Sequence, residues 1–169
     1  MNTIRTQLTL FIEVSQEHIE TVRATYNPEQ YKLISAHITL CREDELKPFD
    51  EIIERLKSMY LKQPLRITLG APERFANGTG VFLPATGPNI EFKTLRETIL
   101  GTKQINEHYP HVTLMHPRNS TCTDPVFSEI KKHKFPTELY FHKISVIEQV
   151  QDGPWQVLDD YYIADRVVI

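Results

Sequence analysis

The sequence has few glycines, few cysteines, no long apolar run and no excess of positive charge, and each shortage excludes a class of protein. Six glycines are spread over 169 residues without a GxxxxGKS, GxxxxGKT or GxGxxG pattern, which excludes the phosphate-binding loops of P-loop and Rossmann proteins. No apolar run approaches the roughly 18 residues that a membrane-crossing helix needs. With 19 Lys and Arg against 22 Asp and Glu, tight nonspecific binding to long double-stranded nucleic acid is not expected, because such binding depends on many basic contacts to phosphate.

The two cysteines, Cys41 and Cys122, stand alone without a CxxC spacing. We therefore expect neither a disulfide framework nor a zinc knuckle. The first residues lack the charged and then apolar layout of a secretory signal, so the sequence predicts a cytoplasmic protein without membrane contact. Its length predicts a single domain over residues 1–169, which we expect to be a monomer.

Hydrophobic periodicity predicts an α+β chain. Alternating apolar residues indicate a strand over residues 4–14, in which Phe11 is the exception on the polar face. A loop is expected around residues 27–28. Apolar residues at helical spacing predict helices from 15 to about 25, from 48 to 60, from 88 to 101 and near 126–132. The further predicted strands are 36–40, 65–69, 81–83, 109–115, a long one over 139–148 and a closing one that begins at Trp155.

The sequence repeats itself at a separation of 74 residues, where HITL at 37–40 maps onto HVTL at 111–114. The same shift maps the predicted helix at 15 onto that at 89, the strand at 65 onto that at 139, and the strand at 81 onto that at 155. We therefore expect one body with two related halves, about residues 1–86 and 87–169, and the first strand as an extra element.

The two HxT segments carry the candidate chemistry. Side chains two positions apart on a strand project from the same face, so His37 and Thr39 should point together, as should His111 and Thr113. An approximate twofold would bring all four into one cleft. At neutral pH one imidazole can be a base while the other is an acid, and hydroxyls can donate to phosphate oxygens. This set suits displacement at phosphorus without a metal.

These paired motifs resemble the 2H phosphoesterase superfamily, also called the 2′-5′ RNA ligase or RNA cyclic phosphodiesterase group. The loop at Tyr26-Asn27-Pro28 and the closing hairpin around Trp155 extend the resemblance to nearly the whole chain. The resemblance implies a bilobal pseudo-twofold α+β fold. Each lobe would hold an antiparallel sheet with outer helices, and the active cleft would lie between the lobes.

The resemblance also implies an activity: hydrolysis, without metal or cofactor, of 2′,3′-cyclic phosphates or related 2′-5′ linkages at RNA ends or on small nucleotides. His37 and His111 would be the acid and base, in an order that stays open, and Thr39 and Thr113 would hold the phosphate. Two alternatives use the same cleft: a non-catalytic nucleotide-binding or regulatory module, and an enzyme that joins RNA ends through a 2′-5′ linkage.

Four further residues are candidates for substrate binding. Many family members carry Arg five residues after the second motif's His, where this chain has His116. Arg42 and Arg118 are the nearby basic residues. Phe11 could stack on a base, because it lies on the polar face of the first strand.

Other residues receive a structural interpretation. His111 and His116 have opposite parity and should face apart, so we predict no metal site. Cys41 and Met115 should continue the cleft-facing rows as an apolar floor. The basic run at 131–134 is expected to be an exposed helix end, and the core is expected to contain Trp155, Phe82 and Tyr162.

Overall fold

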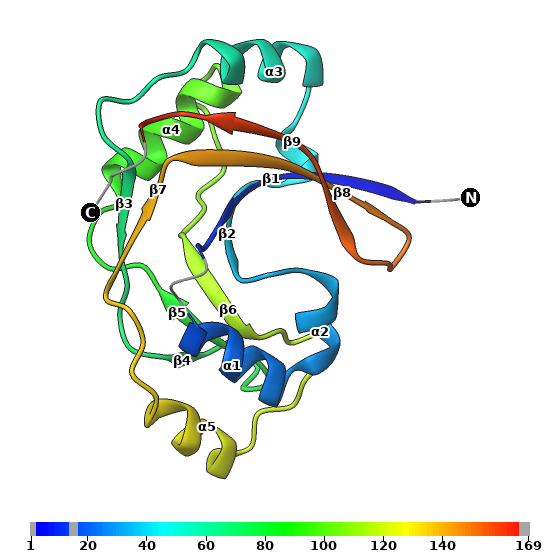
Figure 1. Ribbon diagram of the computed structural model, residues 1–169, viewed down its shortest axis with the longest axis vertical. Coiled ribbons are helices and arrows are strands. Elements are labelled where there is room, and N and C mark those ends of the chain that lie inside the picture. The colour runs from blue at the N-terminus through cyan, green and yellow to red at the C-terminus, as the bar shows by residue number, and fades with distance from the viewer. Residues whose placement is uncertain (1–2, 14–16, 166–169) are drawn as a thin grey trace.

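A mixed arrangement of nine strands and short helices is described by the computed structural model over residues 3–13 and 17–165 (Figure 1). Its strands are β1 (Ile4–Phe11), β2 (His37–Cys41), β3 (Leu65–Thr68), β4 (Glu73–Arg74), β5 (Val81–Pro84), β6 (His111–Met115), β7 (Glu138–Phe141), β8 (Lys143–Val150) and β9 (Trp155–Tyr162). Its helices are α1 (Glu17–Tyr26), α2 (Pro28–Leu33), the 3₁₀ turn η1 (Glu43–Glu45), α3 (Phe49–Ser58), α4 (Ile90–Leu100) and α5 (Asp124–Lys131).

Seven strands form one antiparallel sheet in the order β4-β5-β6-β2-β1-β8-β9, and β3 pairs with β7 in a second sheet. The first six strands of the large sheet form three pairs about its centre: β6 with β2, β5 with β1, and β4 with β8. The two strands of each pair lie about 74 residues apart in the sequence. This order is consistent with the predicted duplication. It contradicts the expectation that the first strand is the extra one, because β1 is the counterpart of β5 and β9 has none. By its place in the sheet β5 groups with β6, although it precedes the expected junction near residue 86, and the bounds of the two halves stay a prediction.

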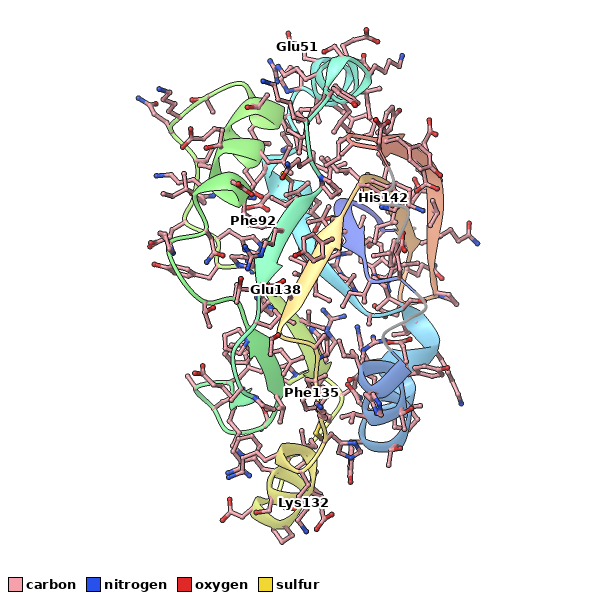
Figure 2. All side chains as sticks on the ribbon, turned by 60° about the vertical axis from the view of Figure 1, so that its left-hand side comes forward. Glu51, Phe92, Lys132, Phe135, Glu138 and His142 are labelled. Carbon is pink, nitrogen blue, oxygen red and sulfur yellow. The ribbon has the colours of Figure 1, made fainter. Side chains whose placement is uncertain are left out.

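The two halves meet where β2 and β6 pair, with Ile38 opposite Val112. This pair joins what were expected to be two lobe sheets into a continuous one. Leu40 and Leu114 are buried beside them, whereas the His and Thr of each motif are half-buried on the opposite face. The helix α1 packs against β6, and α4 packs against β3; Figure 2 shows Phe92, which is buried, on α4.

The predicted long strand over 139–148 is divided in the structure. It breaks at His142: β7 pairs with β3 in the small sheet, and β8 pairs with β1 in the large one. The carbonyl of His142 accepts hydrogen bonds from the backbone N–H groups of Ile163 and Ala164, at 2.8 and 3.3 Å. The adjacent polar residues His142 and Lys143, across which the apolar positions change parity, mark the break in the sequence, but they do not show that the two strands belong to different sheets.

The helices follow their local signals with one exception. The predicted loop at residues 27–28 is the start of α2, which has Pro28 at its first position, as many helices do. Gly101 ends α4 with a positive φ of 68°, as expected. The predicted strand end at Val14 and helix cap at Ser15 lie outside the described residues. No helix of the described ranges has the length and hydrophobicity that crossing a membrane requires.

A buried arginine ties α4 to the end of β2. Arg96 is 1% exposed and donates from both terminal nitrogens to the Glu45 carboxylate, at 2.6 and 3.0 Å. It also donates to the carbonyl oxygens of Leu40 and Asn106, at 2.6 and 3.0 Å. Burial alone would raise the pKa of Glu45, but the hydrogen bonds from Arg96 hold that pKa below its ordinary value. The pair thereby fixes the segment that follows the first motif.

Arg96→Met should lower the free energy of unfolding by about 3–5 kcal/mol, because it leaves the largely buried Glu45 carboxylate without a positive partner. The matched control is Arg66→Gln, which removes an arginine from an exposed pair with Glu138 and should change stability little. Urea denaturation of both variants measures the difference. A loss below about 1 kcal/mol for Arg96→Met would show that the pair is not a structural support.

Candidate active site

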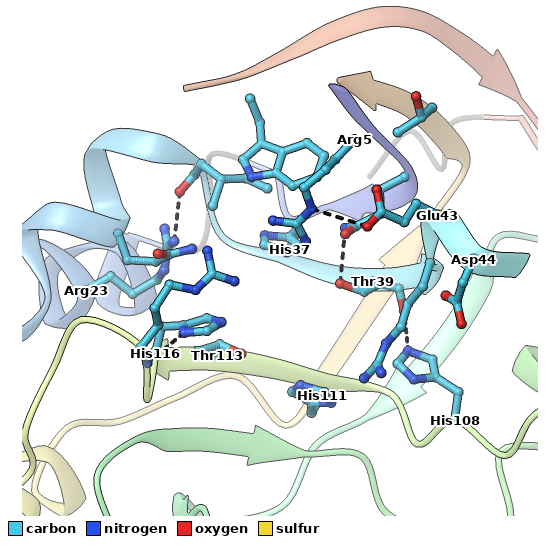
Figure 3. A pocket seen from close by; sticks show the side chains of 17 residues that line it. Arg5, Arg23, His37, Thr39, Glu43, Asp44, His108, His111, Thr113 and His116 are labelled. Carbon is cyan, nitrogen blue, oxygen red and sulfur yellow. Dashed lines mark hydrogen bonds and ion pairs between the residues drawn. The ribbon is translucent and has the colours of Figure 1, made fainter. Parts of the chain in front are cut away.

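One cavity of about 310 Å³ lies where β2 and β6 meet (Figure 3). The two polar faces of the motif strands supply its centre, with residues from β1, α1 and the loops after both motif strands around it. Its wall includes every candidate site residue except Phe11: His37, Thr39, Arg42, His111, Thr113, His116 and Arg118.

Phe11 packs beside the cavity instead of lining it. Its ring lies edge-on to the His37 imidazole, with centroids 6.1 Å apart. Phe75 and Phe82 contact the other imidazole in the same manner, with centroids 6.1 and 5.7 Å from His111. Phe82 was expected in the core but is half-buried. Aromatic edges thus support both imidazoles, a geometry that aromatic rings prefer.

Each motif imidazole is held by a backbone carbonyl two residues before it. Nδ1 of His37 lies 2.8 Å from the oxygen of Ser35, and Nδ1 of His111 lies 3.0 Å from the oxygen of Tyr109. Because a carbonyl only accepts, Nδ1 must carry the hydrogen in both rings. In its neutral form each ring therefore keeps an unprotonated Nε2, for which the described part of the chain supplies no hydrogen-bond partner.

The backbone that holds His37 is itself clamped by α1. Arg23 is 2% exposed and donates to the carbonyl of Ile34 and to Glu20, both at 2.7 Å. The same carboxylate oxygen of Glu20 accepts from the backbone N–H of Ala36 at 3.0 Å. The Ser35 carbonyl is therefore fixed from both sides.

Thr39 is held by a glutamine on the neighbouring strand. Nε2 of Gln7 donates to the hydroxyl oxygens of Thr9 and Thr39, at 2.8 and 3.1 Å. Because the Thr39 oxygen accepts this bond, its own hydrogen is available to a ligand. The backbone carbonyl of Thr39 lies 2.9 Å from Nε2 of His108. Sequence reasoning missed Gln7, although its place on the polar face of the first strand was a usable signal.

His116 holds the opposite tautomer. Its Nδ1 accepts from the backbone N–H of Arg118 at 3.1 Å, so Nε2 carries the hydrogen when the ring is neutral. The side-chain oxygen of Asn27 accepts from the backbone N–H of His116 at 2.8 Å. His116 can therefore donate to an anion without first being protonated, unlike the rings of His37 and His111.

His116 does not face away from His111, as its parity predicted. The strand β6 ends at Met115 and the chain turns, so that His111 and His116 line the same cavity. In the described residues, however, no three His, Cys, Asp or Glu side chains are grouped so as to hold a metal ion.

The predicted apolar floor was also wrong. Cys41 and Met115 are buried behind the sheet, 0% and 2% exposed, and neither lines the cavity. The pairing of β1 with β2 shifts between Leu8 and Thr9, opposite the end of β2, where the alternation of faces is lost. Burial raises the pKa of Cys41 to about 12, which makes the thiol a poor nucleophile.

Two aromatic residues expected in the core lie elsewhere. Trp155 lines the cavity, where the guanidinium carbon of Arg5 lies 5.3 Å from the centroid of its ring. Tyr162, at the other end of β9, is 64% exposed. No sequence signal separates the two, because alternation along β9 does not show which strand it pairs with.

Burial and positive charge keep the cavity histidines neutral. Burial is the main cause that lowers the pKa of His37 to about 4, and the charge of Arg23 adds to it. Burial also lowers the pKa of His111, with a further contribution from Arg42. The pKa of His116 is lowered by burial and then by Arg118. A bound phosphate would act in the opposite direction, because a nearby negative charge favours the protonated ring.

The comparisons with known proteins place the chain in one family. A family model described as the 2′-5′ RNA ligase superfamily matches residues 12–153. Among solved structures, E. coli LigT complexed with phosphate is 13% identical, with a TM-score of 0.62 over 98% of this chain and 100% of that one. TT0787 of Thermus thermophilus is 18% identical, with a TM-score of 0.58 over 94% of this chain and 97% of that one. These likenesses show the fold alone, and no curated protein sequence matches the chain.

The free energy of unfolding should fall as the pH drops from 6.5 towards 4, because the folded state disfavours the protonated imidazole. The contribution of His37 is fully present above pH 6.5 and is lost as the pH passes through about 4. His37→Gln should reduce this loss by up to about 3 kcal/mol, at about 1.4 kcal/mol per pKa unit. Urea denaturation at several pH values measures it. His18→Gln, at an exposed position on α1, is the control, and an equal reduction in both variants would contradict the prediction.

Proposed function

The chain belongs to the 2′-5′ RNA ligase superfamily, and we propose that it is a metal-independent phosphodiesterase. Its substrates would be 2′,3′-cyclic phosphates, or related 2′-5′ linkages, at RNA ends or on small nucleotides. The observation that carries the proposal is the matched pair of imidazoles, His37 and His111, each anchored through Nδ1 so that Nε2 is left for chemistry. Thr39 and Thr113 stand on the same cavity wall.

In the proposed reaction, one imidazole removes a proton from water through Nε2 while the water oxygen attacks phosphorus. The bond from phosphorus to one ribose oxygen breaks, and the other imidazole, protonated at Nε2, gives its proton to that oxygen. Each proton transfer contributes roughly 10²–10⁴ in rate. Hydroxyl hydrogens of Thr39 and Thr113 and the Nε2–H of His116 would stabilise the negative charge on the non-bridging oxygens.

The substrate supplies part of the acid. Both rings are neutral in the free protein at neutral pH because their pKa values are lowered. A phosphate placed between them raises those values and draws one proton into the pair. Since the rings interact, the acid and base pKa values belong to the pair of His37 and His111. LigT, which shares the fold, has been crystallised with phosphate and with 3′-AMP, and ligands of this class fit the proposal.

The joining of RNA ends is a second candidate, because the same four side chains would serve the reverse reaction. It differs in the nucleophile, which is a 5′-hydroxyl instead of water. Supplying an RNA end with a 5′-hydroxyl beside a cyclic phosphate separates the two activities. Saturable binding of both substrates without turnover would instead indicate a nucleotide-binding module.

His37→Ala and His111→Ala should each lower kcat on a nucleoside 2′,3′-cyclic phosphate by at least about 10²-fold, because each removes one proton transfer. The assay contains EDTA, in which the wild-type activity should be unchanged. His133→Ala, in the segment after α5, is the control and should retain full activity. Full activity in either motif variant would overturn the two-histidine mechanism, and loss of wild-type activity in EDTA would overturn metal independence.

The pH profile of kcat/KM should be bell-shaped with its maximum below pH 6.5. This ratio reports the free enzyme, in which the pKa values of His37 and His111 both lie below 6.5. Above the maximum the protonated ring loses its proton, and kcat/KM falls by about tenfold per pH unit. The profile of kcat should lie at higher pH, because bound phosphate raises both values. A kcat/KM that still rises above pH 8 would contradict this prediction.

A further inference from the structure

Two arginines of the cavity lack the carboxylate partner that the others have. In the described ranges the chain has eight arginines, and six of them form ion pairs with Asp or Glu: Arg5, Arg23, Arg55, Arg66, Arg74 and Arg96. The remaining two, Arg42 and Arg118, line the same cavity. Both are exposed, so their free guanidinium groups can bind an anion.

The antiparallel pairing of β2 and β6 places these two arginines at opposite ends of the cavity. Arg42 directly follows β2, near the start of β6, and Arg118 comes after β6, near the start of β2. The effects on the imidazoles agree with this placement, since Arg42 lowers the pKa of His111 and Arg118 that of His116.

The two ends differ in charge. Glu43 and Asp44 follow Arg42 and are the carboxylates that the described structure places on the cavity wall. They disfavour a further anion at that end. The end at Arg118 is lined instead by His116, Arg23 and Gln30. Arg23 is paired with Glu20, but that carboxylate does not line the cavity, so Arg118 carries the unpaired positive charge on the wall at this end.

Arg118 is also held close to the reacting groups. Its backbone N–H donates to Nδ1 of His116 at 3.1 Å, and Asn27 fixes the backbone of His116. The hydroxyl of Ser120 donates to the carbonyl of His116 at 2.7 Å, which closes the same turn. The backbone of Arg118 is therefore fixed beside His116, while its guanidinium group has no carboxylate partner among the residues that the structure describes.

We propose that Arg118 binds a second phosphate of the substrate, so that the cavity prefers nucleotide ends with two phosphate groups over those that carry the reacting phosphate alone. The inference rests on the proposed function of the same site. A second phosphate has two sources, a 5′-phosphate on the same nucleoside or the phosphodiester that links it to the preceding nucleotide of an RNA.

The test compares kcat/KM at low salt for three substrates: adenosine 2′,3′-cyclic phosphate, the same compound with a 5′-phosphate, and a dinucleotide that ends in the cyclic phosphate. We expect the second phosphate to raise kcat/KM by roughly 10-fold, as a charge-assisted hydrogen bond does. Preference for the dinucleotide identifies an RNA end, and preference for the 5′-phosphate alone identifies a mononucleotide. Equal values for all three would overturn the inference.

Three variants show which residue causes the preference for a substrate with a second phosphate. Arg118→Gln should reduce the ratio between the doubly and singly phosphorylated substrates to near one, whatever the absolute rates. Arg42→Gln should lower kcat/KM on all substrates by one factor and keep the ratio. Lys62→Gln removes the same charge from a different groove and should change neither. A ratio that survives in Arg118→Gln would show that another group binds the second phosphate.

A measurement of equilibrium binding tests the role of Arg118 independently of whether the protein turns a substrate over. Calorimetric titration compares adenosine 3′-phosphate with adenosine 3′,5′-bisphosphate, for wild type and Arg118→Gln. Tighter binding of the bisphosphate that depends on Arg118, without turnover of any substrate, would support the inference and overturn the proposed function. Turnover of the cyclic phosphates without any preference for a second phosphate, in binding or in kcat/KM, would support the proposed function and overturn the inference.

Discussion

The site depends on the pairing of β2 with β6, in which Ile38 lies opposite Val112. This contact brings the two motif strands side by side in opposite directions, with both apolar faces in the core and both polar faces in one cavity. A slip of one residue in either strand would bury a His and a Thr and expose two core residues. The burial of the aliphatic neighbours therefore holds the relative positions of the two His-x-Thr motifs.

Under the proposed function, phosphate binding and acid–base chemistry place opposite demands on the cavity. Burial, and then the positive charge of nearby arginines, lowers the pKa of His37 and His111, so both rings are bases at neutral pH and neither is an acid. Under the proposed function, the substrate corrects this balance itself, because its negative charge favours protonation of one ring. Substrate binding and proton uptake are then a single event, and His116 adds a neutral donor that needs no proton at all.

The features that could be predicted from the sequence are those that depend on residues close together along the chain. Parity alone places His37 beside Thr39, and Gly101 ends its helix for a local steric reason. The misses concern partners far away in the chain. The polar residues at His142 and Lys143 mark a break but do not show that the next strand joins another sheet. Alternation along a strand likewise does not reveal the shifted pairing that buries Cys41, or which strand pairs with β9 and brings Trp155 to the cavity.

The strand order has a consequence for how the chain holds together. The last strand of the first half, β4, pairs with β5 of the second, and β8 of the second half pairs with β1 of the first. Each half therefore completes the other's sheet, and β3 with β7 ties them again. A chain cleaved between β4 and β5 would yield two fragments with unpaired strand edges, suited to reassemble by complementation and unsuited to fold apart. The strand pairing thus makes the two halves that the sequence predicts depend on each other to complete both sheets.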